Sequence, residues 1–203
     1  MTRRSEIDLT SPAIRVSTAE LHGHTCVVTG ASSGIGRAIA VALASAGATV
    51  CAVARRRAEL EATANRVNGA GRFAIHPADL LDDEQVASLA ETLLAREGGV
   101  DVLVHSAGTI SLGDFETGSV RDLDRQYAAN VRAPYLLTQA LLPALRANGG
   151  QIVFINSTVG LTARATAIAL PIPLLAPVTT QVWSWSSELL IAVAAAVEIW
   201  QLR

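Results

Sequence analysis

A run of small residues at positions 29 to 36, Thr-Gly-Ala-Ser-Ser-Gly-Ile-Gly, has the character of a phosphate-binding turn. It follows a short apolar run, Thr25–Thr29, and it opens a long stretch of small residues, Ile35–Ala46, that stops at Gly47. This order predicts a strand, a glycine-rich turn and a helix. Glycines in such a turn let the backbone approach a pyrophosphate, whose charge meets the exposed amides and the positive end of the helix. A tight turn without a ligand is the alternative. The residues expected to hold a dinucleotide here are Thr29, Gly30, Ser32, Ser33, Gly34, Ile35 and Gly36.

Three consecutive arginines follow the next apolar run, Thr49–Ala54. An acidic residue at the end of this strand would accept a hydrogen bond from a ribose 2′-hydroxyl and repel a 2′-phosphate, but the position is Ala54. The arginine fork suits a phosphate, so Arg55 and Arg56 favour NADP(H) over NAD(H). A solvated basic start of a helix is the alternative, although cations there oppose the helix dipole.

Apolar and amphipathic segments alternate along the chain and supply the elements that position these residues. Continuously apolar strands that alternate with helices predict a parallel, doubly wound α/β sheet with a Rossmann-like order. After the first strand and helix, the expected segments are strands Thr49–Ala54, Arg72–Pro77, Val100–His105 and Gln151–Asn156, and helices Ala58–Val67, Asp83–Arg96 and Asp122–Ala147. We expect a polar extension over residues 1–23, a dinucleotide-binding domain over 24–163 and an atypical apolar tail over 164–203.

Composition narrows the classes of partner and compartment. The 203 residues carry a net charge of −2 and provide no broad basic field, which argues against nucleic acid as a partner. The two cysteines, Cys26 and Cys51, are too few for a disulfide scaffold and are expected to be buried thiols. Because the start of the chain lacks the pattern of a signal peptide, we expect a cytoplasmic protein. His22, His24 and Cys26 alternate but have no further ligand nearby, so no metal site is expected.

Four further segments follow the glycine-rich turn in a fixed order. They are Pro77-Ala78-Asp79-Leu80, His105-Ser106-Ala107-Gly108, Ala129-Asn130-Val131 and Ile155-Asn156-Ser157-Thr158-Val159-Gly160. With the wide spacing Thr-Gly-x-x-x-Gly-Ile-Gly, these segments give a chain that resembles the short-chain dehydrogenase/reductase family over about residues 21–163.

The resemblance implies an oxidoreductase that transfers a hydride between a nicotinamide cofactor and a carbonyl or secondary alcohol of a small molecule. It implies that Asp79, with Leu80 beside it, meets the adenine ring, and that Asn130 and Ser157 are active-site residues. Ser106, Ala107 and Gly108 match the family's Asn-Asn-Ala-Gly segment, where both asparagines are replaced here. The resemblance further implies a homo-oligomer built through two long helices.

The family's proton donor is missing from the sequence. A Tyr-x-x-x-Lys motif is expected about 13 residues after Ser157, where the chain reads Ala-Leu-Pro-Ile-Pro-Leu, and no lysine occurs anywhere. A tyrosine without a nearby cation keeps its pKa near 10 and cannot donate efficiently at neutral pH. Tyr127 lies three residues before Asn130, but we expect it to pack in the core. The chain is thus expected to be an impaired NADP(H)-dependent oxidoreductase, with a catalytically inactive nucleotide-binding protein as the alternative.

The last 40 or so residues differ from the rest: from residue 165 onward only Glu188, Glu198 and Arg203 are charged. A reading-frame shift near residues 162–166, a membrane or partner-binding tail, and a non-catalytic regulatory domain are the three explanations. The apolar runs 167–178 and 189–200 are shorter than the ~20 residues that span a bilayer. If the family's later strands are replaced by this tail, the sheet is incomplete at its C-terminal side, which predicts poor solubility or a non-native oligomer.

Overall fold

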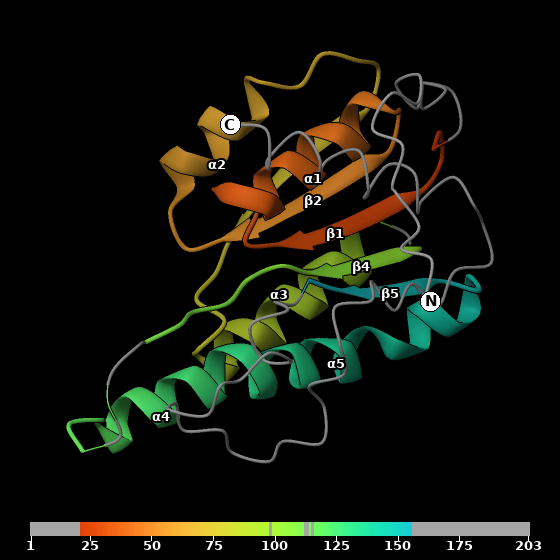
Figure 1. Ribbon diagram of the computed structural model, residues 1–203. Coiled ribbons are helices and arrows are strands. Elements are labelled where there is room, and N and C mark those ends of the chain that lie inside the picture. The colour runs from red at the N-terminus through yellow and green to blue at the C-terminus, as the bar shows by residue number, and fades with distance from the viewer. Residues whose placement is uncertain (1–20, 98, 112–113, 115, 156–203) are drawn as a thin grey trace, which may run out of the picture.

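The computed structural model describes residues 21–97, 99–111, 114 and 116–155. Five parallel strands form one sheet in the order β3-β2-β1-β4-β5 (Figure 1). The strands are β1 (Thr25–Thr29), β2 (Thr49–Ala54), β3 (Arg72–Pro77), β4 (Val102–His105) and β5 (Gln151–Phe154). The predicted α/β doubly wound fold is therefore confirmed for this part of the chain.

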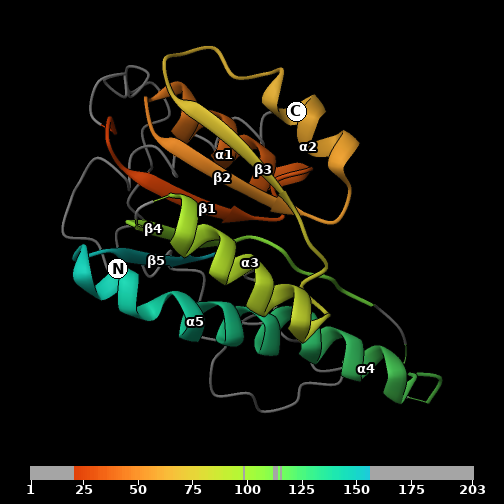
Figure 2. The ribbon, with the colours of Figure 1, turned by 180° about the vertical axis from the view of Figure 1, so that it is seen from behind.

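Helices cover both faces of the sheet. They are α1 (Gly34–Ser45), α2 (Arg57–Ala64), α3 (Asp83–Arg96), α4 (Val120–Tyr127) and α5 (Ala133–Ala147), with one turn of π-helix, η1 (Ala128–Arg132), between the last two. Helices α1 and α2 lie on one face, and α3 and α5 lie on the other (Figures 1 and 2).

The two faces have separate hydrophobic cores because side chains alternate along each strand. Val28 of β1 packs under α1 and α2, whereas its neighbour Val27 packs under α3 and α5. Every residue of β1 is buried. A strand buried on both faces is mostly apolar, and in β1 only the threonines at its two ends are polar. The apolar runs therefore predicted the central strands to within two residues.

The single long helix expected over residues 122–147 is divided. Helix α4 ends at Tyr127, the π-turn η1 follows, and α5 begins at Ala133. Pro134 lies in the first turn of α5, has no N–H to offer the carbonyl of Asn130, and would press its ring against that carbonyl in a continuous α-helix. The proline in this segment was the sequence feature that could have predicted the interruption.

Several predictions lie wholly or partly outside the described residues: the polar extension, the apolar tail, the end of the sheet beyond β5, and Ser157. Among the described helices, none combines the length and the apolar character needed to cross a membrane.

Candidate functional site

The strand order reverses between β1 and β4, and the loops that leave these two strands meet there. Thr29, at the end of β1, is 1% exposed, and its hydroxyl oxygen accepts hydrogen bonds from the backbone N–H groups of Ser106 (3.0 Å) and Ala107 (3.1 Å). The same hydroxyl donates to the carbonyl oxygen of Val104 at 3.3 Å. Thr29 therefore fixes the loop after β4 against the loop after β1 at the topological switch point, where ligands of open α/β sheets bind.

Two glycines allow this close packing. Gly30 has φ +69°, and a Cβ atom there would lie 2.8 Å from the carbonyl oxygen of Ser106. A Cβ on Gly36 would lie 2.4 Å from the carbonyl oxygen of Gly30. Because the opposing atoms belong to the backbone, neither position has room for a side chain.

The N-terminus of α1 is open to a ligand. Its first residue, Gly34, has φ +52°, and a Cβ there would meet nothing within 4 Å. Ser33 makes no capping hydrogen bond to the helix, and the first turn contains no acidic residue. The guanidinium of Arg37 instead donates to the carbonyl oxygen of Ser32, which orders the turn. The first amides of α1 have no hydrogen-bond partner among the described residues, and together with the helix dipole they fit a pyrophosphate.

The predicted arginine fork is divided between two roles. Arg56 pairs with Glu59 at 2.5 Å, and this hydrogen bond lowers the pKa of the Glu59 carboxyl below its ordinary value. Arg57 lies 3.9 Å from Glu61. Arg55 is exposed and has no ion-pair or hydrogen-bond partner in the part of the chain that the structure describes. The spacing of Arg56 and Glu59, three residues apart, is a feature from which the first pair could have been predicted.

Arg55 nevertheless lies close to the glycine turn. The backbone N–H of Ala31 donates to the carbonyl oxygen of Val53 at 3.2 Å, which places the end of β2 beside the turn. Arg55 is two residues beyond that contact. Of the two predicted cations, Arg55 is therefore the one that no described residue holds away from a phosphate.

Asp79 follows β3 at the same edge of the sheet. One oxygen of its carboxylate accepts a hydrogen bond from the N–H of Leu81 at 3.1 Å, and its own N–H donates to the side chain of Gln85 at 2.9 Å. Leu80 is half-buried against the core under α3 and α5. Asp79 thus lies in an ordered turn, and its second carboxylate oxygen has no partner within the described residues.

His105, which replaces the first asparagine of the family segment, is a buried residue at the end of β4. Its Nε2 lies 2.8 Å from the hydroxyl of Thr138, and its ring stacks on Phe154 with centroids 4.8 Å apart. Burial lowers the pKa of His105 to about 4, so the ring is neutral at pH 7. A neutral, enclosed imidazole packed against α5 does not replace the missing proton donor. No feature of the sequence could have predicted the hydrogen bond between His105 and Thr138.

Asn130 lies in the π-turn and holds the loop that follows Gly108. Its amide oxygen accepts from the N–H of Thr109 at 2.9 Å, and its amide nitrogen donates to the carbonyl oxygen of Thr109 at 2.8 Å. Gly108 faces the same amide: a Cβ there would lie 3.1 Å from the oxygen of Asn130. The side chain therefore acts as a clamp on the backbone, and its catalytic role stays a prediction.

We expect Asn130→Asp to lower the free energy of unfolding by about 0.5–1.5 kcal/mol, because a carboxylate cannot donate to the carbonyl oxygen of Thr109 and this exposed hydrogen bond is lost. Chemical denaturation would measure the loss. Gln126→Glu is the matched control, since Gln126 only accepts, from the N–H of Ser111 at 3.1 Å. Equal losses in both variants would contradict the clamp.

Tyr127 corrects one prediction: it is 50% exposed and does not pack in the core. Helix α4, which it ends, buries none of its side chains. The helix extends beyond the end of the sheet (Figure 1), so an amphipathic pattern on it has no core to face. Ser157, the other predicted active-site residue, lies outside the described residues.

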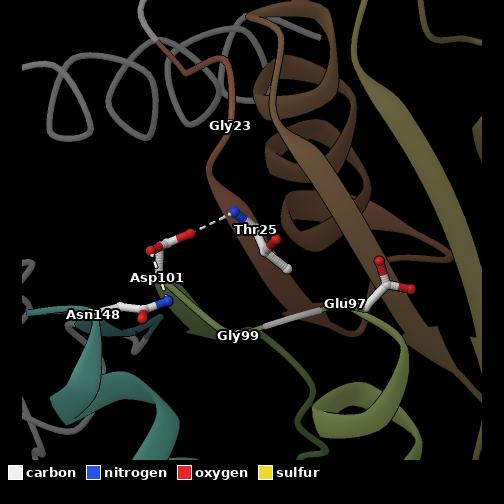
Figure 3. A pocket seen from close by; sticks show the side chains of 6 residues that line it. All are labelled: Gly23, Thr25, Glu97, Gly99, Asp101 and Asn148. Carbon is white, nitrogen blue, oxygen red and sulfur yellow. Dashed lines mark hydrogen bonds between the residues drawn. The ribbon is translucent and has the colours of Figure 1, made fainter.

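A hollow lies at the opposite end of the sheet, at the starts of β1 and β4 (Figure 3). Asp101 is one of the residues that line it. Its carboxylate accepts hydrogen bonds from the N–H of Thr25 at 2.7 Å and from the side-chain amide of Asn148 at 3.1 Å. Both carboxylate oxygens of Asp101 are therefore used in holding structural elements together. None of the predicted site residues lines this hollow.

The structure shows the environment of both cysteines and of the histidines that precede Cys26 in the chain. Both cysteines are fully buried thiols, as expected, and burial raises the pKa of each to about 12. His24 is exposed and lies 3.8 Å from Asp101, whereas Cys26 points into the core under α1. The alternating residues near the start of the chain therefore do not converge.

Comparison with known proteins gives concordant matches. A family model described as short chain dehydrogenase matches residues 24–169. A short chain dehydrogenase of Pseudocercospora fijiensis is 39% identical over 145 residues, which are 69% of this chain and 47% of the relative. A D-threitol dehydrogenase of Mycolicibacterium smegmatis is 37% identical over 152 residues, 74% of this chain and 56% of the relative. The chain thus spans about half the length of the curated relatives it matches.

Solved structures agree with the fold. A metagenomic short-chain oxidoreductase in complex with NADP has a TM-score of 0.65 and 40% identity, covering 69% of this chain and 65% of its own. A 7α-hydroxysteroid dehydrogenase complexed with NADH and 7-oxo glycochenodeoxycholic acid has a TM-score of 0.68 and 27% identity. The match covers 74% of this chain and 59% of the dehydrogenase.

Proposed function

The chain belongs to the short-chain dehydrogenase family, and from this membership we propose that it binds NADP(H) where the loops after β1 and β4 meet. Its proposed substrate is a small molecule with a carbonyl or secondary alcohol, and its proposed hydride transfer is impaired. The observation that carries the proposal is the cradle at the switch point. Gly30 and Gly36 leave no room for side chains there, and the first turn of α1 has neither a cap nor an acid.

Each part of the cradle has a separate task. The exposed N–H groups at the start of α1 bind the pyrophosphate, because they and the helix dipole favour negative charge. Asp79 lies at the end of β3, where its free carboxylate oxygen accepts from the adenine amino group. Thr29 and Asn130 do not need to touch the ligand; they hold the loop of Ser106, Ala107 and Gly108 in position. The bound nicotinamide supplies the hydride in this chemistry.

Arg55 supports the preference for NADP(H). Among the three consecutive arginines, Arg55 is the one without a side-chain partner in the described part of the chain, and it lies beside the glycine turn. Because relatives of this fold are solved with NADP and with NADH, the family alone does not choose. A guanidinium forms charge-assisted hydrogen bonds with a 2′-phosphate and has no such partner in NADH.

We expect Arg55→Ser to raise the dissociation constant for NADPH about tenfold or more, since a hydrogen bond to a charged group contributes about 1.5–3 kcal/mol. The constant for NADH should stay within about twofold. Arg57→Ser is the control, because this neighbouring arginine pairs along its own helix with Glu61. Fluorescence titration of each cofactor measures the change. If both cofactors weaken alike, Arg55 does not read the 2′-phosphate.

The proposed impairment rests on the sequence. The position where the family places its tyrosine reads Ala-Leu-Pro-Ile-Pro-Leu, and the chain has no lysine. His105, at the end of β4, is neutral and buried. Two measurements test the whole proposal: a binding titration with NADPH, and an assay of NADPH consumption with a panel of ketones. We expect binding with little turnover; fast turnover would contradict the impairment, and no binding would contradict the cofactor site.

Two further points belong to the same proposal. We place the dinucleotide-binding domain at residues 24–163, between the polar extension and the apolar tail, on the pattern of the sequence. The cytoplasm is the proposed location because both cysteines are free thiols.

A further inference from the structure

Three side chains from separate parts of the chain converge under α3, on the face of the sheet away from α1. They are Cys51 of β2, His76 of β3 and Glu97, which follows α3. One ligand atom from each lies within 4.8 Å of the other two. We propose that these residues form a binding site for a transition-metal ion of borderline softness, with Zn²⁺ as the first candidate.

The register of the sheet explains the convergence. Cys51 lies opposite Ala74, and Val53 lies opposite His76. Residues two apart on a strand share a face, so Cys51 and His76 are diagonal neighbours on the face that α3 covers. Helix α3 starts after β3 and runs back across this face, which brings Glu97 to the same place (Figure 2).

His76 gives an independent reason to expect a ligand. The residue is only 9% exposed, and its Nε2 has no hydrogen-bond partner among the described residues. Leaving a buried polar atom unpaired costs free energy, so such atoms are rare and call for an explanation. Imidazole nitrogen is the commonest metal ligand in proteins. A metal ion in contact with Cys51 and Glu97 would satisfy it.

The donor set suits zinc. A thiolate, an imidazole and a carboxylate are the three ligand types that Zn²⁺ takes, and three protein ligands leave a fourth position for water. Donor atoms around a tetrahedral zinc lie roughly 3.5 Å apart, as its bond lengths imply. The site would therefore have to contract by about 1 Å on binding, and Cys51 would release its thiol proton to the solvent.

Two arginines compete with the metal ion. Arg72 lies 3.1 Å from Glu97, and Arg96 also carries positive charge near His76. The side chain of Arg72 is 63% exposed, whereas that of Glu97 is 3% exposed. Arg72 can therefore turn into the solvent while Glu97 stays in place. This arrangement predicts that removing Arg72 strengthens metal binding, the opposite of removing any ligand.

The experiment uses the full chain without a histidine tag, with Co²⁺ as a spectroscopic probe and Zn²⁺ as the competitor. We expect Co²⁺ to give the absorption band of a cobalt thiolate, and Zn²⁺ to abolish it. Cys51→Ser should remove the band, while Cys26→Ser, which replaces the other fully buried cysteine, should keep it. Glu97→Gln should weaken Co²⁺ binding at least about tenfold.

Arg72→Gln should tighten binding severalfold, and circular dichroism confirms that each variant is folded. If Cys51→Ser does not fold, the opposite responses of Glu97→Gln and Arg72→Gln decide. The proposal is overturned if wild-type protein gives no thiolate band at millimolar Co²⁺. A band that survives in folded Cys51→Ser, or one that disappears in Cys26→Ser, also overturns it. NADPH is absent throughout, so the outcome does not depend on the cofactor site.

Discussion

Gly30→Ala is expected to weaken NADPH binding by roughly 30- to 700-fold. The left-handed backbone at φ +69° costs an alanine about 1–2 kcal/mol, and its Cβ would collide with backbone atoms of Ser106 and Ala107 at 2.8 and 2.9 Å. The two costs together reach about 2–4 kcal/mol, and a factor of ten in affinity corresponds to about 1.4 kcal/mol. The turn must open to accept the methyl group, which separates the amides proposed to bind the pyrophosphate.

Gly23→Ala provides the control for strain. Gly23 has φ +85°, but a Cβ there meets nothing within 4 Å, and the residue lies by the opposite end of the sheet. This variant should lose about 1–2 kcal/mol of stability, as strain alone requires, with NADPH affinity unchanged. Fluorescence titration and chemical denaturation measure both quantities. Equal NADPH affinity in the two variants would show that the contact between the loops does not form the cofactor site.

The second large effect is a loss of stability in acid caused by His105. Its pKa is lowered from 6.5 to about 4 by burial, so the unfolded chain binds a proton at a pH where the folded chain does not. Stability from this group is full above pH 6.5 and declines as the pH falls toward 4. The expected loss between pH 7 and pH 4 is about 3 kcal/mol.

His105→Asn, which restores the family's residue, should remove this part of the acid sensitivity. The carboxyls and His76, whose pKa burial also lowers, titrate in both proteins, so the difference between the proteins isolates His105. Thr138→Val is the control, because it removes only the hydrogen bond to Nε2 and leaves the ring in place. It should lower stability by about 1 kcal/mol at every pH. A wild-type pH profile in His105→Asn would show that the buried imidazole is not the acid-sensitive group.

Local patterns were sufficient for the strands, for the helices before residue 120 and for the loop that follows β1. Apolar runs marked β1 and β2 because strands buried on both faces are apolar at nearly every position, with threonine only at their ends. The glycines predicted the turn because Gly30 and Gly34 adopt a positive φ, a local backbone conformation that favours glycine. The prediction that Tyr127 packs in the core was wrong, because helical periodicity does not show whether a core lies beneath the helix.

The sequence by itself determined the fold class, the family and the glycine-rich turn after β1, because each depends on residue types within a few positions of one another. Tertiary structure alone decided which groups meet across the sheet. The strand order brings Thr29 to Ser106, and the register of β2 with β3 brings Cys51 to His76. The members of these groups are separated in the chain by 21 to 77 positions, and no spacing rule in the sequence links them. Hydrogen bonding between strands sets the distances within the sheet, and the path of α3 sets the distance to Glu97.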